Sequence, residues 1–398
     1  MPSPHDLFNQ LNETVKKAYE KKYKTSETKF IKASEEKPPT GLILDNPLLE
    51  HVLDRRYLSY GRFYLVYGKK SSSKTSLFYD IAKMFQKNGG KVIWLETENA
   101  IDLEYAKKQG VNLDEVTLIH PQTLEEALNV AELYIRSLGK IDPEGQMPIL
   151  ICLDSIAGST TDYEQDSTNN MTNTMPGTHA RLLARFYREM EHPLANERCV
   201  FLALNQLKTK IGGFVPFGGE AESMMGGEAP RFSSTYQIKM ERTGDLKKTN
   251  EHGAERKIGS KHDITCTRNK LGREGNTQKV SFDLYINGGI DWYTPLVRLI
   301  GEHYPDLINK AGSYYRWKVD GMTYKGLEDE DIPLSTEEQY RDFELGAIIR
   351  RCEAAKEAIR TVLEVPAMPS EEDLKASENE RLAKRKKKRE TEKEPKEL

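Results

Sequence analysis

One segment, Gly68-Lys-Lys-Ser-Ser-Ser-Lys-Thr75, constrains the fold of this chain more than any other stretch. It follows an apolar run over residues 62–67 and precedes a run with helical periodicity over residues 76–85. A strand, a tight loop and a helix in this order form the context of a phosphate-binding loop. The backbone N–H groups of such a loop point at a phosphate, and the dipole of the following helix favours its negative charge. The segment therefore predicts a nucleotide site.

The side chains of this segment have separate expected roles. Lys74 is expected to reach the β- and γ-phosphates of ATP, and the Thr75 hydroxyl to bind Mg²⁺. Ser73 stands where the pattern G-x-x-x-x-G-K-[ST] has a glycine, so a serine-rich turn before a helix is the alternative interpretation. The predicted nucleotide-binding residues here are Gly68, Lys69, Lys70, Ser71, Ser72, Ser73, Lys74, Thr75 and Ser76.

The composition limits the classes to which the protein can belong. The net charge of the 398 residues is −3 with 30% charged residues, so any nucleic-acid-binding surface must be local. No run approaches the ~18 apolar residues of a membrane span, and the N-terminal segment has no signal-peptide pattern. The 4 cysteines form no C-x-x-C pair and the 8 histidines show no metal-ligand spacing. We expect a cytosolic protein without a zinc site.

The order of apolar patterns indicates an α/β fold. Strands are expected over 63–67, 91–95, 116–120, 148–153, 199–203, 236–240, 264–267 and 279–286, and helices over 76–87, 103–109, 124–138 and 180–191. The first strands are continuous apolar runs, which is typical of a parallel sheet buried on both faces. The last strands follow one another without helices, which predicts antiparallel hairpins. We expect four parts: an N-terminal oligomerisation helix and linker (1–39), the core (40–290), a smaller mixed segment with a helix over 342–363 (291–365), and a charged, poorly ordered tail (366–398).

The first part contains an amphipathic helix. Over residues 4–22, apolar side chains recur at steps of three and four: Leu7, Phe8, Leu11, Val15 and Tyr19. A polar stretch separates this helix from the core. Its apolar stripe is therefore expected to pack either on a neighbouring subunit or back on its own domain.

Polar residues follow the expected strands at the edge where open α/β sheets bind ligands. Asp154 ends the strand over 148–153 and is a candidate Mg²⁺ ligand beside Thr75. Glu96 and Glu98 share one face at the end of another strand, so either can orient an attacking water, and a solvated strand end is the alternative. Gln206, after the strand over 199–203, can bond a γ-phosphate and act as a switch.

Two long loops leave this edge. Residues 208–227 form a glycine-rich loop in which Lys208 and Lys210 are expected to contact phosphate, with Ile211 or Phe214 wedged between bases. Residues 160–178 form a polar loop that leads into a helix. That helix carries Arg181, Arg185 and Arg188 on one face. An arginine face is more often solvated, but two loops at one edge favour DNA. Considered alone, Arg268-Asn-Lys270 indicates an exposed charged strand.

Together these residues resemble the RecA-type ATP-dependent DNA strand-exchange recombinases, including the bacteriophage UvsX branch, over about residues 40–317. The most specific segment is Glu98-Asn-Ala-Ile-Asp-Leu-Glu-Tyr-Ala-Lys-Lys-Gln-Gly-Val-Asn112. Ala311-Gly-Ser-Tyr-Tyr-Arg-Trp317 is similar to the family's motif near the start of the carboxyl domain. The resemblance implies a P-loop ATPase core with a mostly parallel central sheet, an N-terminal helical arm that docks on the neighbouring protomer, and a small C-terminal α+β domain.

The resemblance also implies roles at the nucleotide. Glu98 matches the catalytic glutamate, Tyr105 the aromatic residue that stacks on adenine, and Gln206 the γ-phosphate sensor. Arg268 and Lys270 match paired cations that reach ATP on the adjacent subunit. The implied catalytic residues are Glu98, Lys74, Gln206, Arg268 and Lys270; Tyr105 and Asp102 join the nucleotide-binding residues, and Thr75 and Asp154 are the metal ligands.

The implied DNA-binding residues lie in and near the two loops: Arg181, Arg188, Lys208, Lys210, Ile211, Gly212, Gly226 and Gly227. Several positions depart from the family. The phage branch also tolerates replacement at the position of Ser73. The family's basic residues for the second DNA strand have no clean counterpart here, because Glu241 and Asp263 stand near those positions. Arg242, Lys261 or other residues would take that role. The tail contains the basic run 384–389 where the bacterial tail is acidic. We interpret it first as a solvated mixed-charge tail, and accessory attraction to DNA is the second interpretation.

The sequence thus predicts an ATP- and single-stranded-DNA-dependent recombinase that forms helical filaments and exchanges strands in recombination, repair and recombination-dependent replication. Its cofactors would be ATP and Mg²⁺. Its partners would be single-stranded DNA, homologous double-stranded DNA and further copies of the chain, with a single-strand-binding protein and a loader also compatible; no membrane is expected. It would act in the cytoplasm of a bacterial cell, or of the host if phage-encoded. The alternatives are a RecA-fold ring helicase and an ATP-binding filament mediator without strand exchange. The loop over 208–227 and the detached N-terminal helix favour the filament former.

Overall fold

The computed structural model describes residues 4–23, 38–166, 177–209, 222–250, 253–273, 278–376, 378–379 and 382–383. By its contacts the chain divides into two units, one formed by Met1–Thr40 with Pro369–Leu398 and the other by Gly41–Met368. The first unit contains helix α1 (Pro4–Lys22), which confirms the helix predicted over 4–22. Its apolar side chains Leu7, Phe8, Leu11 and Val15 are all exposed.

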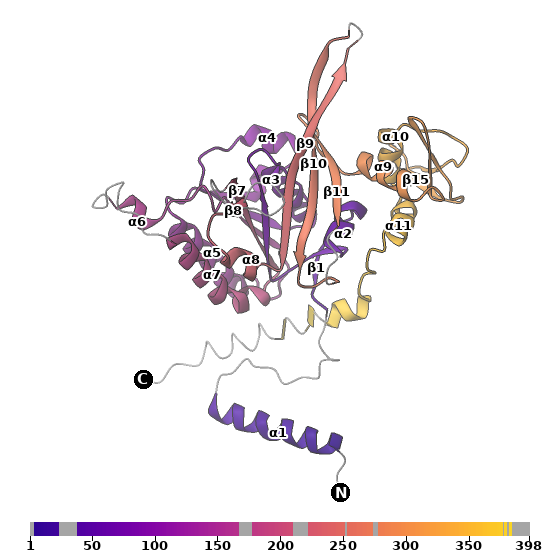
Figure 1. Cartoon of the computed structure of the whole chain (residues 1–398). Helices are drawn as coiled ribbons and strands as arrows, with labels where there is room; N and C mark the ends of the chain where they lie inside the picture. The colour runs from indigo at the N-terminus through magenta and orange to yellow at the C-terminus, as the bar shows by residue number, and fades with distance from the viewer. Residues whose placement is uncertain are drawn as a thin grey trace, which may run out of the picture. The chain divides into compact units, whose positions relative to one another are not determined.

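The second unit is built on one large sheet (Figure 1). Within the described residues its order is β12-β11-β10-β9-β3-β7-β6-β4-β5, and β8 pairs with β7. The pairs from β9 through β5 are parallel, whereas β9 to β12 pair antiparallel, which confirms the predicted sheet with an antiparallel end. The strands are β3 (Arg62–Gly68), β4 (Lys91–Glu96), β5 (Val116–Ile119), β6 (Ile149–Asp154), β7 (Cys199–Thr209), β8 (Glu222–Met224), β9 (Tyr236–Thr249), β10 (Glu255–Asn269), β11 (Lys279–Tyr285) and β12 (Gly289–Asp291).

Helices cover both faces of this sheet. On one face lie α2 (Pro47–Leu53), α3 (Lys74–Lys87) and α4 (Leu103–Lys108); on the other lie α5 (Leu124–Ile141) and α7 (Thr178–Ala195). Side chains alternate along each strand, so Tyr64 and Val66 of β3 join the first core while Phe63 and Leu65 join the second. Since both faces are buried, the central strands must be apolar at successive positions, which explains their continuous apolar runs. Shorter elements connect them: β1 (Gly41–Ile43), β2 (Tyr57–Ser59), the 3₁₀ turn Leu113–Glu115, α6 (Asp162–Gln165) and α8 (Ala229–Ser233).

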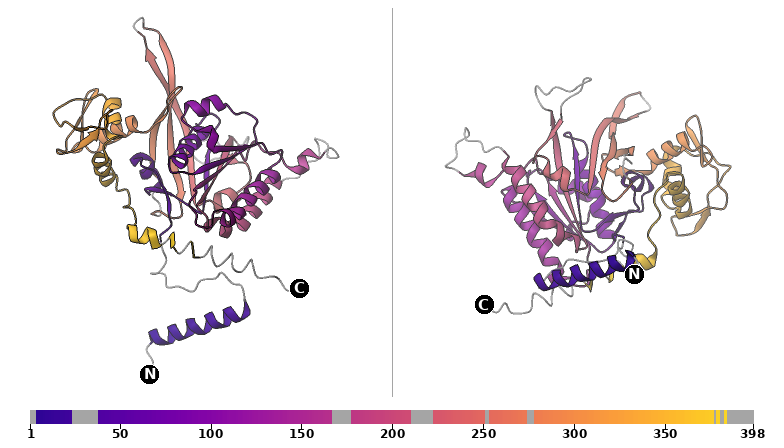
Figure 2. Two further views of the ribbon diagram at one scale, coloured as in Figure 1. Left: turned by 180° about the vertical axis from the view of Figure 1, so that it is seen from behind. Right: turned by 60° about the horizontal axis from the view of Figure 1, so that its bottom comes forward.

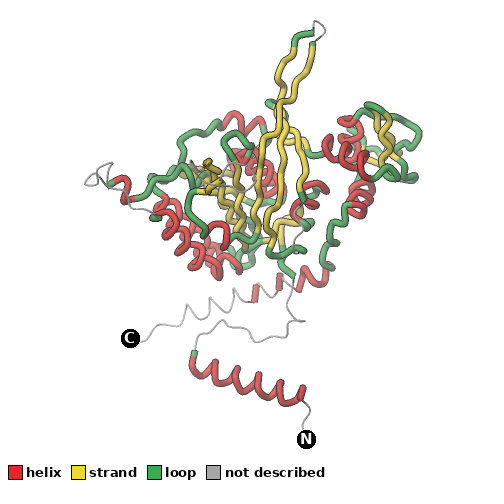
Figure 3. Tube along the Cα trace, in the orientation of Figure 1, coloured by secondary structure: helices red, strands yellow, loops and turns green. Residues whose placement is uncertain are grey.

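Strands β9 and β10 form a hairpin that is much longer than the apolar pattern predicts. They contain 14 and 15 residues, whereas the pattern predicts strands only over 236–240 and 264–267. The outer part of the hairpin extends beyond the rest of the sheet (Figures 1 and 3), and the reverse view in Figure 2 shows the same projection. Its outer residues are largely exposed and polar, so they carry no apolar alternation from which a strand could be predicted.

A small α+β region follows β12. It contains α9 (Tyr293–His303), the hairpin of β13 (Ile308–Ala311) and β14 (Tyr314–Trp317), the hairpin of β15 (Thr323–Lys325) and β16 (Asp331–Pro333), then α10 (Asp342–Ile349) and α11 (Glu353–Val362). The prediction of one helix over 342–363 is therefore wrong. The chain turns after Ile349, and buried Cys352 begins the next helix as an extended N-cap whose Sγ accepts the Ala355 N–H. The break between the two helices could not be predicted, because the apolar periodicity of the sequence continues through Cys352.

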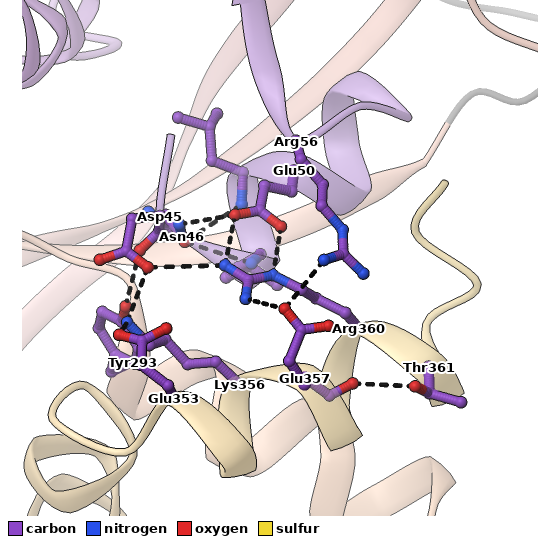
Figure 4. A network of polar contacts seen from close by, with 12 residues as sticks. Asp45, Asn46, Glu50, Arg56, Tyr293, Glu353, Lys356, Glu357, Arg360 and Thr361 are labelled. Atoms are coloured by element: carbon purple, nitrogen blue, oxygen red, sulfur yellow. Dashed lines mark hydrogen bonds and ion pairs between the residues drawn. The ribbon is translucent and has the colours of Figure 1, made fainter. Parts of the chain in front are cut away.

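A buried ion-pair network holds α11 against α2 (Figure 4). The Arg360 guanidinium donates to both carboxylate oxygens of Glu50, at 2.7 and 2.8 Å. Glu50 is 0% exposed, and its carboxylate also accepts the Asn46 N–H. Lys356, which is 1% exposed, donates to Asp45 at 2.7 Å. A buried charge is tolerated only when it is paired, so these contacts fix the C-terminal helices to the core.

Removing one partner of this network should destabilise the second unit strongly. We expect Glu50→Gln to lower the free energy of unfolding by about 3 kcal/mol, because Arg360 would lose its fully buried carboxylate partner and keep only the partly exposed Glu357 and Asp45. Urea unfolding followed by circular dichroism measures this. The control is Glu132→Gln, which breaks the half-exposed pair with Arg136 and should cost less than about 1 kcal/mol. Equal losses in the two variants would contradict the structural role given to the network.

Candidate functional site

The parallel strands bring several of the predicted site residues to one edge of the sheet. β3 leads into the phosphate loop, β4 ends at Glu96, β6 ends at Asp154, and β7 passes through Gln206. In the strand register Glu96 lies opposite Asp154, and Gly68 lies opposite Gln206. Four separate stretches of sequence therefore meet where their carboxyl ends align, which is where open α/β sheets bind ligands.

The phosphate loop makes a tight turn between β3 and α3. Ser71 and Ser73 adopt left-handed backbone conformations, with φ of 62° and 69°. A Cβ atom added at Gly68 would lie 2.2 Å from the carbonyl oxygen of Met240, so a larger residue would displace the neighbouring strand. The loop ends at the N-terminus of α3, where the backbone N–H groups of the first turn and the helix dipole favour an anion.

Lys74 folds back into this loop. Its Nζ donates to the carbonyl oxygens of Gly68 at 3.2 Å and Lys69 at 3.0 Å. Burial lowers the pKa of Lys74, and the negative charges of Asp154 and Glu98 oppose that shift. The Lys74 ammonium group therefore interacts electrostatically with the carboxylates of both Asp154 and Glu98.

Thr75 and Asp154 form the predicted metal pair. The Thr75 hydroxyl donates to Asp154 Oδ2 at 3.2 Å. Burial, followed by the charge of Glu98, raises the pKa of Asp154 to about 7. A divalent cation at these oxygens would favour the ionised carboxylate, and hard oxygen donors are the ligands that Mg²⁺ prefers. The donor set therefore fits Mg²⁺.

Glu96 is built into the turn that follows β4. It is 3% exposed, and its carboxylate accepts the backbone N–H groups of Glu98 and Asn99, each at 2.9 Å, and of Ala100 at 3.3 Å. His120 Nδ1 lies 3.2 Å from the same carboxylate. Glu96 thus organises the backbone of the turn.

Glu98 faces the other predicted site residues. Its Oε1 accepts hydrogen bonds from Ser155 Oγ and, at 2.9 Å, from Gln206 Nε2. The residues alone left Glu96 and Glu98 as alternatives for orienting water, and the resemblance implied Glu98, which is the one that contacts Gln206. Ser155 was missed as a contributor, although its position directly after Asp154 at a strand end could have indicated it.

Gln206 is joined to the segment that closes the second long loop. Neighbouring Asn205 is fully buried; its Nδ2 donates to the Met225 carbonyl oxygen at 2.8 Å, and its Oδ1 accepts the Gln206 N–H at 2.9 Å. Lys208 is exposed on β7, where it pairs with Ser223 of β8. The predicted DNA-binding residues Lys210, Ile211 and Gly212 lie outside the described residues.

Gly226 and Gly227 pack this closing segment against α7. Both have positive φ, 83° and 67°. A Cβ at Gly226 would lie 2.4 Å from Leu183 Cδ1, and one at Gly227 would lie 2.8 Å from Ala180 Cβ. The structure thereby brings the end of the second loop to the helix that carries the exposed side chains of Arg181 and Arg188.

Tyr105 and Asp102 lie at the start of α4. The Asp102 carboxylate caps this helix by accepting the Tyr105 N–H at 2.9 Å. The Tyr105 ring is partly buried and packs edge-on against Tyr79, with 6.2 Å between ring centroids. The resemblance implied that Asp102 binds the nucleotide, and in the structure its carboxylate caps α4.

Arg268 and Lys270 do not meet the phosphate loop of their own chain. The Lys270 N–H bonds to Thr235, whose N–H bonds to Phe63 near the beginning of β3, whereas the phosphate loop follows the end of β3. Arg268 donates to the Arg231 carbonyl oxygen at 3.2 Å, and Lys270 Nζ to that of Phe232 at 2.7 Å. Burial and the neighbouring charge of Arg268 lower the pKa of Lys270.

A further side chain beside the loop, His262 of β10, was also missed. It is 0% exposed and bonds Ser73 Oγ at 2.9 Å. Because His262 is 189 residues from Ser73 in sequence, no local pattern could predict their contact.

The central parallel sheet, the phosphate loop and the Thr75–Asp154 pair define a P-loop α/β protein. The family model for the RecA N-terminal domain matches residues 27–291. The chain is 31% identical over 279 residues to Protein RecA of Xanthomonas euvesicatoria pv. vesicatoria (strain 85-10), covering 70% of this chain and 74% of that protein. It is 31% identical over 257 residues to Protein RecA of Delftia acidovorans (strain DSM 14801 / SPH-1), covering 65% and 64%. The chain belongs to the RecA family of recombinases. Among the described helices, none has the length and apolar content needed to cross a bilayer.

Proposed function

We propose that this protein is an ATP- and single-stranded-DNA-dependent recombinase that assembles into helical filaments and exchanges strands between homologous DNAs. The observation that carries the proposal is that the residues expected to contact the nucleotide lie in two separate places within one chain. The loop with Lys74 lies at one edge of the sheet, and Arg268 and Lys270 lie towards the other. A complete site therefore requires a second copy of the chain.

On this proposal the residues at the carboxyl edge bind the nucleotide. Magnesium-bound ATP supplies the transferable phosphoryl group and the negative charge that the loop recognises. The loop amides and Lys74 would hold the phosphates, Thr75 and Asp154 would hold the metal ion, and Tyr105 would contact the base. Glu98, held by Ser155 and Gln206, orients the attacking water.

The contact between Glu98 and Gln206 would couple the nucleotide to DNA. Gln206 lies on β7, and the end of that strand leads into the second predicted DNA loop. Asn205 ties the same strand to Met225 beyond that loop. A change of Gln206 on hydrolysis would therefore shift both ends of the loop, which is a ligand-dependent switch between two states.

DNA contact would fall on the loops and on α7. Arg181, Arg188 and Lys208 are exposed, and Lys210, Ile211 and Gly212 continue the same loop in sequence. Such residues hold the phosphate backbone and wedge between bases, which is binding without sequence preference. The exposed apolar side chains of α1 support docking of this helix on an adjacent protomer.

Joint-molecule formation separates this function from its rivals. The protein should pair a circular single strand with homologous linear duplex in the presence of ATP and Mg²⁺, and a heterologous duplex is the control. Unwinding of a forked duplex without pairing would favour the ring helicase. Stimulation of another recombinase without intrinsic pairing would favour the mediator.

The two strand-end glutamates provide a matched pair of variants. We expect Glu98→Gln to lower ATP turnover by about 10²–10⁴-fold with little change in nucleotide affinity, because an amide neither withdraws a proton nor orients water as well. Glu96→Gln should leave turnover close to wild type while lowering the free energy of unfolding by about 1–3 kcal/mol, since one carboxylate oxygen that accepts backbone N–H groups is lost. Steady-state hydrolysis and urea unfolding measure the two effects. The reverse pattern would exclude Glu98 as the catalytic residue.

Two inactive variants should complement each other if the nucleotide site is shared between protomers. Lys74→Ala removes the phosphate-loop cation, and Lys270→Ala removes the cation that would come from the neighbour. Each alone should lose most DNA-stimulated hydrolysis. In a mixture, interfaces that join the intact loop of one variant to the intact Lys270 of the other should regain activity. A mixture no more active than its components would contradict a shared site.

A further inference from the structure

Ser73 occupies a strained place in the phosphate loop. Its backbone is left-handed, with φ of 69° and ψ of 27°, and it is the N-cap of α3 without a side-chain capping bond. A residue with a Cβ atom is disfavoured there, whereas glycine is not. Something other than local preference must therefore hold the loop in this conformation.

His262 contacts the loop from the neighbouring strand. Ser73 Oγ lies 2.9 Å from His262 Nε2, and Ser260 Oγ lies 2.8 Å from the same nitrogen. The ring also hydrogen-bonds the backbone of Ser72. It stacks on Phe282 with 5.2 Å between centroids and 15° between planes. The imidazole is thus fixed by β10 and β11 while it bonds two consecutive residues of the loop.

We propose that His262 is a positioning residue of the phosphate loop: its bond to Ser73 maintains the left-handed turn that glycine would otherwise adopt without assistance. This inference rests on the proposed nucleotide site, since it concerns how tightly the loop is held for phosphate. It assigns a role to a buried histidine that is 189 residues from Ser73 in sequence.

The protonation state of His262 is compatible with this role. Burial, followed by the positive charge of Arg242, lowers its pKa to about 4; Lys257 acts in the same direction and Asp263 opposes it. The ring is therefore neutral near pH 7. In a neutral ring that carries its proton on Nδ1, the lone pair of Nε2 can accept from a serine hydroxyl such as that of Ser73. The bond should then persist unchanged through the neutral pH range.

The contact also connects the phosphate loop to β10, a strand that forms part of the projecting hairpin and leads to Lys270. β10 carries His262 at the base of the projecting hairpin, and the same strand ends beside Lys270.

A double-mutant cycle tests the proposal. The variants are Ser73→Gly, His262→Leu and the two combined, and the measurement is the affinity for a fluorescent non-hydrolysable ATP analogue in the full-length protein. His262→Leu should weaken binding by about fivefold, the size of one net hydrogen bond. Ser73→Gly alone should bind equally or more tightly. In the Ser73→Gly background His262→Leu should weaken binding by clearly less than fivefold, because glycine needs no support at position 73 and only the bond to the Ser72 backbone is lost.

Urea unfolding of the same proteins supplies a second readout that needs no nucleotide. The two substitutions should be non-additive in the free energy of unfolding, as expected for residues in contact. Ile264→Val is the matched control: it trims a fully buried side chain of the same strand, and should lower stability without changing nucleotide affinity. Additive effects of Ser73→Gly and His262→Leu on affinity would overturn the positioning role and leave the proposed function intact. A wild-type protein that binds no nucleotide would overturn both.

Discussion

The alignment of the carboxyl ends of β3, β4, β6 and β7 is the constraint on which the rest of this structure depends. Because the strands are parallel and in register, Gly68 faces Gln206 and Glu96 faces Asp154 although they are far apart in sequence. Helices bury both faces of the sheet, so the strand positions cannot slip without exposing apolar side chains. The position of the phosphate loop, the Thr75–Asp154 contact and the Glu98–Gln206 contact are consequences of that register.

The antiparallel end of the sheet connects the phosphate loop with residues towards the opposite edge of the sheet. β9 continues the parallel order beside β3, and β10 then reverses direction. The reversal carries His262 to the phosphate loop and Lys270 towards the opposite edge. One strand therefore touches its own nucleotide loop and presents the cations that, on our proposal, complete the site of a neighbour. The buried Glu50–Arg360 pair holds the C-terminal helices to the same unit.

Much of this could be predicted from sequence, for physical reasons that can be named. Gly68–Thr75 is a local motif between a strand and a helix, and strands buried on both faces are visible as apolar runs. The outer hairpin could not be predicted because its residues are exposed on both faces. The break before Cys352 and the contact between Ser73 and His262 depend on tertiary packing. The residues alone left Glu96 and Glu98 as alternatives, and the resemblance assigned Glu98. The structure adds that Glu96 ends β4 and accepts backbone N–H groups, whereas Glu98 follows the strand and contacts Ser155 and Gln206.

The central claim is that ATP is bound between protomers, so that the nucleotide controls assembly on DNA. Electron microscopy of the protein with long single-stranded DNA and a non-hydrolysable ATP analogue tests this claim most directly. The account predicts continuous helical filaments with the analogue, and their loss when it is omitted or when Lys74 is replaced by alanine. Closed rings, or filaments that form equally well without nucleotide, would contradict it.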